Sequence, residues 1–258
     1  GYLDSNSDEK PWVKYHDYVK HLVLSQSVGT GTPYLPMDVE DVTINCNNDC
    51  TMFYDVKSGT ITVNGNGIFT VDLDVSDKIN LFYNMSDTRH LIVSDGITEI
   101  REGKEGGALG VSDLIIGKDL KSMEGIIKYD GTVRVDPANP YLTTYENCLY
   151  SKDYTKLFRA CSNFQDIKFH PNLAILGKDC FFRCEIDNST LILPWGITTL
   201  EDNIFEAING KVDTIIFPDT IKNVANNSPD YIVTSTTIIY SINNQAADKL
   251  LSISKVHR

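Results

Sequence analysis

The sequence has few basic residues and no long apolar run. It contains 23 Lys and Arg against 35 Asp and Glu, which gives a formal net charge of −12 at pH 7. Nucleic acids are held by clustered basic side chains, so this deficit argues against a nucleic-acid partner and equally against an anionic membrane surface. No stretch of about 18 or more consecutive apolar residues occurs, and we therefore expect no insertion into a membrane.

Residues that commonly carry catalysis or bind metals are sparse. The histidines are scattered, at His16, His21, His90, His170 and His257, and no Gly-x-Ser-x-Gly or His-Glu-x-x-His motif occurs. The acidic group of Asp72, Asp74 and Asp77 lacks the glycine and the glutamate of an EF-hand loop. We predict no enzyme activity, no metal and no cofactor. The alternative is a catalytic site assembled from distant residues, for which perturbed acids in a deep pocket would be the sign.

The six cysteines are too few for a disulfide-dense scaffold of 258 residues. Cys46 and Cys50 could bridge across a turn in an oxidising compartment. Cys180 and Cys184 occupy small apolar positions of the repeat described below, so we expect most of the six to be free, buried thiols. Zinc is the remaining alternative, which is disfavoured because no histidine pair accompanies these cysteine pairs.

An apolar pattern recurs at an almost fixed spacing through most of the sequence. The segment Thr190–Leu200 is matched by Thr214–Val224, 24 residues later, and by Asp166–Leu176, 24 residues earlier. Further copies at spacings of 23 are centred on Ile92, Ile115 and Ile239. This period falls in the leucine-rich-repeat range of roughly 20–29 residues. The sequence therefore predicts a stack of repeated coils.

Each unit offers one short strand and a return turn, which is too little to enclose its own apolar side chains. Strand side chains alternate, so Leu191 and Leu193 should point to one side, and Ile197 and Leu200 should complete the inward set. Pro194 lies just past the strand, where a missing backbone N–H ends the ladder. Burial then requires that neighbouring coils share one elongated hydrophobic interior.

These residues resemble the BspA-like leucine-rich repeats of bacterial and some protozoan surface proteins. The family pattern is an apolar strand, Pro or Asp-Gly, an apolar, two polar and an apolar residue, then Ala-Phe followed by Cys. The segments Leu176–Cys184 and Leu200–Phe205 match its second half, with Cys180 and Ile204 in place of the small residue. The resemblance implies a mainly β leucine-rich-repeat solenoid with short parallel strands, β-hairpin insertions and few short helices. It also implies a secreted or cell-surface protein whose signal peptide has been removed.

The pattern divides the chain into two segments. We expect residues 1–85 to form a β-rich segment with a degenerate repeat strand at 21–25 and a hairpin. Residues 86–258 should form the solenoid, with a hairpin insertion at about 134–164 and a turn near Asp153. A closing strand and short helix are expected in 239–251, because a terminal unit must cover the open end of the core.

One set of positions departs from ordinary solvent-facing patterning. If Leu191 and Leu193 point inward, Ile192 points outward, and its equivalents make up a set that we call the stripe: Val23, Ile92, Ile115, Lys168, Ile192, Ile216 and Ile239. The simpler explanation is that β-branched residues suit strands, or that a loop covers them. The alternative explanation is that the stripe forms a partner-binding surface. We accordingly predict a non-catalytic protein that binds a protein or glycan, with host adhesion implied by the resemblance. The alternative is an accessory or spacer module of a larger surface protein or enzyme, without a partner of its own.

Overall fold

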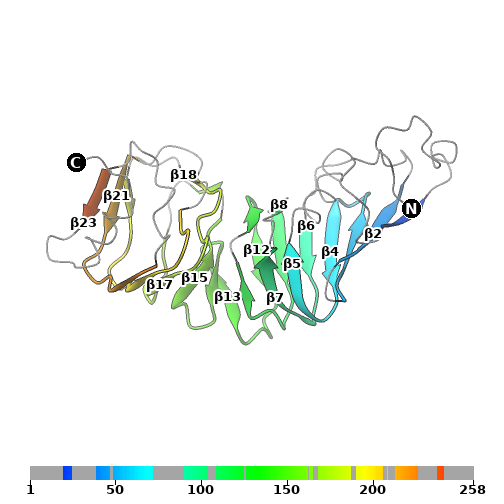
Figure 1. Ribbon diagram of the computed structural model, residues 1–258, viewed down its shortest axis with the longest axis horizontal. Helices are drawn as coiled ribbons and strands as arrows, with labels where there is room; N and C mark the ends of the chain where they lie inside the picture. Colours follow the sequence, from blue (N-terminus) through cyan, green and yellow to red (C-terminus); the bar gives the residue numbers. More distant parts are fainter. Residues whose placement is uncertain are drawn as a thin grey trace.

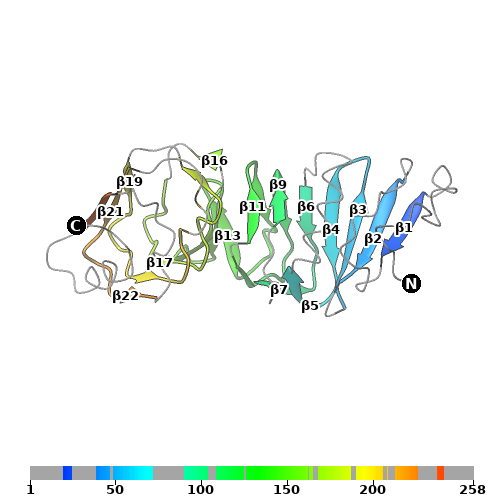
Figure 2. The same cartoon turned by 45° about the horizontal axis from the view of Figure 1, so that its top comes forward.

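The chain is a curved, elongated stack of short strands, with the first strands at one end and the last at the other (Figures 1 and 2). The computed structural model describes residues 20–24, 39–46, 49–71, 90–103, 109–124, 126–161, 163–164, 168–186, 190–205, 208, 213–225 and 237–240. All regular elements among these residues are strands, β1 to β23. This confirms the mainly β leucine-rich-repeat architecture. The described part of the chain contains no helix long and apolar enough to span a membrane.

One face of the N-terminal half is a seven-stranded sheet with the order β1-β2-β3-β4-β6-β9-β12. Its strands are β1 (His21–Leu24), β2 (Asp41–Asn45), β3 (Thr51–Asp55), β4 (Thr60–Asn64), β6 (His90–Val93), β9 (Asp113–Ile116) and β12 (Val133–Val135). The hairpins β2-β3 and β3-β4 are antiparallel, whereas β4, β6, β9 and β12 pair in parallel. Because β4 pairs with β6, this sheet continues through the boundary expected at residues 85 and 86.

Two smaller sheets form the other sides of the same half. The second side is β10-β7-β5, made of β5 (Gly67–Val71), β7 (Ile97–Glu102) and β10 (Ser122–Met123). The third is the parallel pair of β8 (Leu109–Val111) and β11 (Ile127–Tyr129). Each coil therefore visits three sides in turn, as β6, β7 and β8 do before β9 starts the next coil.

The C-terminal half repeats this plan. Its first side is β19 (Thr190–Ile192), β21 (Thr214–Phe217) and β23 (Thr237–Tyr240). Its second side has the order β13-β14-β15-β17-β20-β22, made of β13 (Leu142–Tyr145), β14 (Cys148–Ser151), β15 (Lys156–Arg159), β17 (Ile175–Leu176), β20 (Thr199–Leu200) and β22 (Asn223–Val224). Its third side is β16 (Asn163–Phe164) with β18 (Glu185–Ile186). The helix expected in 239–251 lies outside the described residues, as does the acidic group at 72–77.

The strand registers confirm the repeat spacing. Leu91 lies beside Leu114, and Leu191 lies beside Ile215, on parallel strands. Ile215 in turn lies beside Ile238. Adjacent coils are therefore offset by the 23 or 24 residues that the pattern predicts. The earlier equivalent, Ile167, falls outside the described residues.

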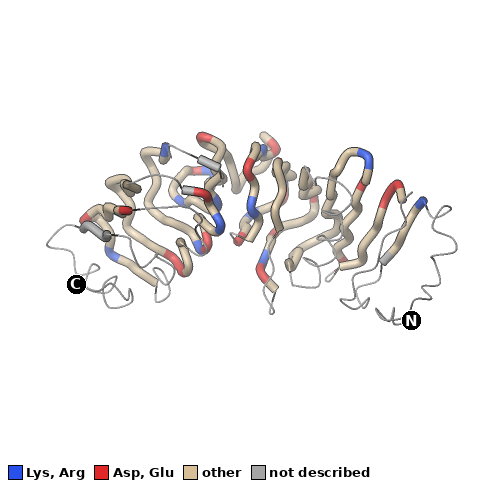
Figure 3. The backbone as a smooth tube through the Cα atoms, turned by 90° about the horizontal axis from the view of Figure 1, so that it is seen from above, with Lys and Arg blue, Asp and Glu red and all other residues tan. Residues whose placement is uncertain are grey.

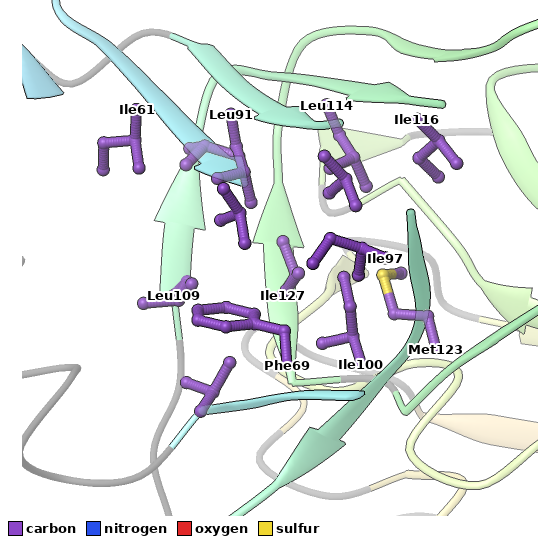
Figure 4. Close-up of a cluster of buried hydrophobic side chains, with 14 of the residues drawn as sticks. Ile61, Phe69, Leu91, Ile97, Ile100, Leu109, Leu114, Ile116, Met123 and Ile127 are labelled. Atoms are coloured by element: carbon purple, nitrogen blue, oxygen red, sulfur yellow. The ribbon is translucent and has the colours of Figure 1, made fainter. Parts of the chain in front are cut away.

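The interior is filled by the alternate residues that the pattern assigns to it. Leu191 and Leu193 are 3% and 2% exposed, while Ile192 between them is 62% exposed. In the N-terminal half the inward residues of the three sides meet along the axis of the stack (Figure 4). Members of this cluster are Ile61, Phe69, Leu91, Ile97, Ile100, Leu109, Leu114, Ile116, Met123 and Ile127. Each coil thus covers the core of its neighbours.

A three-stranded meander, β13-β14-β15, joins the two halves. Its first turn is made by Glu146 and Asn147, both at positive φ (45° and 59°), and the second lies at 152–155, as expected near Asp153. The Asn147 side chain accepts from the Val133 N–H (2.8 Å) and donates to the Gly131 carbonyl, so it covers backbone groups beside the outer edge of β12. Sequence reasoning did not identify this turn.

The meander also accounts for the curvature of the stack between its two halves. It adds two antiparallel strands to the second side only. At 4.7–4.9 Å per strand, they lengthen that side along the stack by about 9–10 Å. Among the described residues, no strand of the first side lies between β12 and β19, so one sheet stops at β12 and a new one starts at β19. Strands β13, β15 and β17 lie on the outer side of the curve in Figure 1.

Five of the six cysteines are buried, and Cys46 is half-buried. The Cys46 thiol lies 3.6 Å from the Ile44 carbonyl oxygen, and the Cys50 thiol lies 3.6 Å from that of Ile68. Cys148, Cys180 and Cys184 take part in no disulfide. Burial as small apolar residues, the expectation for most of them, is confirmed.

Candidate functional site

The structure divides the stripe between two sheets. Ile92 and Ile115 are lateral neighbours on β6 and β9 of the seven-stranded sheet. Ile192, Ile216 and Ile239 are neighbours on β19, β21 and β23. Val23 lies on β1, and Lys168, an exposed residue outside the strands, lies between the two sheets in sequence. The stripe therefore forms two outward surfaces, which we call the N-terminal face and the C-terminal face.

The exposure of these residues varies along the stripe. Val23 is 67% exposed, Ile192 is 62% exposed and Ile115 is 37% exposed. Ile92 and Ile216 are half-buried by their neighbours. For Ile92, Ile115, Ile192 and Ile216, the outward direction follows from strand alternation, because the residues on either side of each are buried in the core.

Two exposed aromatic residues extend these faces, and sequence reasoning missed both. Phe53 is 37% exposed on β3, between the lateral neighbours Thr43 and Thr62. The alternation Met52-Phe53-Tyr54 could have revealed it, since Met52 and Tyr54 are fully buried. Trp195 is 72% exposed in the turn after β19. Its place next to the strand-ending proline was visible in the sequence, although its exposure was not.

The register of the N-terminal face defines two parallel rows of outward side chains. The central row is Val23, Thr43, Phe53, Thr62, Ile92, Ile115 and Arg134. The polar row is His21, Asp41, Asp55, Thr60, His90 and Asp113. Two residues separate the rows along each strand, which corresponds to about 6.4–6.8 Å.

Two histidines of the polar row each contact a carboxylate on the neighbouring strand. His21 Nδ1 is 2.6 Å from Asp41 Oδ2, and His90 Nδ1 is 3.0 Å from Asp113 Oδ2. The side chain of Thr132 donates to Asp113 Oδ1, and this hydrogen bond is the main reason that the pKa of Asp113 is lowered. The Thr132 N–H and His90 contribute further. The backbone and side chain of Ser58 lower the pKa of Asp55 in the same way.

The lowered pKa of Asp113 makes a prediction about acid stability. A carboxyl whose folded-state pKa lies below its unfolded value, about 3.9, contributes stability above that value and loses it as the pH falls through the folded pKa. We expect Asp113→Asn to lower the melting temperature at pH 7 and to lose this deficit below about pH 4. Thermal unfolding across this pH range measures the difference. A deficit that stays constant down to pH 3 would mean that packing, and not charge, is responsible.

The described residues that resemble catalytic groups are held in structural contacts. The His170 ring stacks on Tyr154 at 4.0 Å and meets the edge of Tyr145, while its Nδ1 accepts from the Asn172 N–H. Burial raises the pKa of the Cys148 thiol to about 12 and that of Cys184 to about 11, so both stay protonated and are poor nucleophiles. Over the described ranges, no group of three or more His, Cys, Asp or Glu could hold a metal ion.

The fold and the two outward faces define a class of protein. A solenoid with a period of 23 to 24 residues, one shared interior and flat outward strand faces is a leucine-rich-repeat protein. Residues 153–251 match the family model described as the BspA type leucine rich repeat region, in six copies. The repeats of this C-terminal part match the family that the resemblance implied.

Three solved structures are similar to the chain. A leucine-rich repeat protein from Eubacterium ventriosum is 13% identical, with a TM-score of 0.42 over 80% of this chain and 73% of that one. The pneumococcal vaccine antigen PcpA is 17% identical, with a TM-score of 0.38 over 62% and 53%. A leucine rich cell surface protein from Faecalibacterium prausnitzii is 11% identical, with a TM-score of 0.30 over 83% and 98%. No curated protein matches the sequence.

Proposed function

We propose that this protein is a non-catalytic binding protein, secreted or displayed at a cell surface, whose stripe residues contact a protein or glycan partner. Adhesion to host tissue is the role that its repeat family suggests. The observation that carries the proposal is the exposure of apolar side chains at register-matched positions. Val23, Ile115 and Ile192 keep between 37% and 67% of their surface in water.

The repeat architecture supports this role. A solenoid grows along one axis and so presents an extended surface, and exposed apolar patches on soluble proteins commonly mark interaction sites. The C-terminal face places Ile192 beside Ile216, and the exposed Trp195 follows in the same coil. Tryptophan is among the residues that contribute most to binding energy at interfaces.

The C-terminal face gives the first test. The double variant Ile192→Asp and Ile216→Asp places two charges among the apolar contacts, and a buried unpaired charge opposes binding strongly. We expect loss of partner binding, measured against host matrix proteins and on a glycan array, with unchanged circular dichroism. The folded state should persist because Ile192 is 62% exposed and Ile216 is half-buried.

A matched control adds the same charge elsewhere. Asn172 and Asn223 are exposed residues outside the outward stripe positions, and Asn172→Asp with Asn223→Asp should leave binding unchanged. If the isoleucine variant binds as well as the wild-type protein does, the stripe is not the binding surface.

A further inference from the structure

The N-terminal face is apolar along one row and acidic along the next. The central row exposes Val23, Phe53 and Ile115, whereas the polar row carries Asp41, Asp55 and Asp113. Asp41 and Asp113 keep 23% and 27% of their side-chain surface exposed. The acidic groups therefore border the apolar row at a fixed distance of two residues along the strands.

Fixed positive charge on this face is scarce. Among the described residues of the two rows, Arg134 at the far end, on β12, is the one Lys or Arg, against three carboxylates. Nearby, Lys20 is paired with Glu40 at 3.2 Å. The histidines of the polar row carry charge only when protonated. The charges along the polar row are thus predominantly negative, in keeping with the net charge of −12 of the whole chain.

The carboxylates of the polar row can also accept more hydrogen bonds than their neighbours donate. Asp41 contacts His21 through Oδ2, and Asp55 accepts from Ser58 through Oδ1. A carboxylate offers about four lone-pair sites on two oxygens, so each can accept further hydrogen bonds from a cationic donor. Lysine and arginine donate to carboxylates in this way, and such charge-assisted bonds are about twice as strong as neutral ones.

We infer that the N-terminal face binds a polypeptide segment whose aliphatic side chains lie on the central row and whose Lys or Arg side chains lie along the polar row. The inference rests on the proposed binding function and adds the chemistry of the partner. Charge complementarity carries it, because an acidic row repels anionic proteins and sulfated or sialylated glycans and attracts a basic segment. Neutral glycans would gain no charge-dependent attraction from the row.

The test begins with selection of a random peptide display library on the full chain. The enriched peptides should combine Lys or Arg with aliphatic residues, and their affinity should fall as salt is raised. The variant Asp41→Asn with Asp55→Asn removes two charges but retains the amide oxygens that accept from His21 and Ser58. We expect it to weaken the selected peptides by roughly tenfold, because two exposed charge-assisted contacts are lost and their effects combine.

The control removes the same charge elsewhere. Glu146→Gln with Asp219→Asn neutralises two exposed turn residues outside the N-terminal face and should leave peptide affinity unchanged. A second variant, Val23→Ser with Ile115→Ser, tests the apolar row and should also weaken binding. If this variant loses binding while Asp41→Asn with Asp55→Asn does not, the proposed function stands and the basic partner is wrong.

Other outcomes overturn the inference as well. Enrichment of neutral or acidic peptides, or an equal effect of the Glu146 and Asp219 control, would show that the polar row does not select charge. So would binding of neutral glycans that is insensitive to Asp41→Asn with Asp55→Asn, if no peptide is enriched. If neither row affects any bound ligand, the N-terminal face is not a binding surface and the proposed function is left to the C-terminal face.

Discussion

Phe205→Ala should destabilise the protein by about 3–5 kcal/mol, the usual cost of emptying a fully buried phenylalanine site. Phe205 is 1% exposed and stacks on Phe181 of the preceding coil, with ring centroids 5.5 Å apart and planes 10° apart. The Phe205 ring also meets the Phe217 ring edge to face, with the ring centroids 6.3 Å apart. Removing the ring therefore breaks contacts between coils and not only within one. The change is measured as the shift in thermal or urea-induced unfolding.

Trp195→Ala is the matched control for the loss of a large aromatic ring. Trp195 lies in the same coil as Phe205 but is 72% exposed, so its replacement should change stability by no more than about 0.5 kcal/mol. Equal losses from the two variants would mean that Phe205 is not enclosed between coils.

Gly96→Ala should strongly destabilise the N-terminal half of the stack. Gly96 has a φ of +91°, and a Cβ there would lie 2.5 Å from the carbonyl oxygen of Gly65, in the preceding coil. The left-handed backbone costs about 1–2 kcal/mol, and forcing two backbones apart adds about 1–3 kcal/mol, so we expect a loss of about 2–5 kcal/mol. Thermal unfolding of the purified variant measures this loss.

Gly67→Ala separates the two causes. Gly67 has nearly the same φ, +92°, but nothing lies within 4 Å of the position that its Cβ would take. Gly67→Ala should therefore reduce stability only by the cost of the left-handed backbone conformation. If Gly67→Ala and Gly96→Ala were equally harmful, the coils would not approach each other as closely at Gly65 and Gly96 as the structure shows.

The repeat could be predicted from the sequence because every coil must bury apolar side chains at the same positions. Leu191, Ile197 and Leu200 recur at positions where only burial against the next coil removes them from water. Strand alternation then fixed the outward direction of Ile192. Both conclusions depend on local periodicity, which one sequence displays directly.

The meander and the bend could not be predicted in the same way. The turn at Glu146 and Asn147 contains no glycine, and its two positive φ values carry no strong sequence signal. Cys148 and Tyr150 face the C-terminal core, while Leu149 between them faces the N-terminal core. This alternation reads as an ordinary strand, so the sequence did not reveal that β14 lies where two cores meet.

The candidate faces were predicted only in part for a related reason. The stripe was found through positions repeated at the period of the coils, and Phe53 and Asp55 lie in antiparallel hairpin strands that do not share that period. Their alignment with Ile92 and His90 depends on the pairing of β3 with β4 and of β4 with β6. Register across three strands is a long-range property, which a local pattern does not specify.

Methyl-labelled protein in solution gives the most direct test of the stacked coils. Leu91 and Leu114 lie side by side with buried side chains, and so do Leu191 and Ile215. A nuclear Overhauser spectrum should show methyl contacts within both pairs, and Ile192 should show none with Leu191's inward partners. If the methyl groups of Leu91 and Leu114, or those of Leu191 and Ile215, gave no contact in the folded protein, the shared interior of the stack would be contradicted.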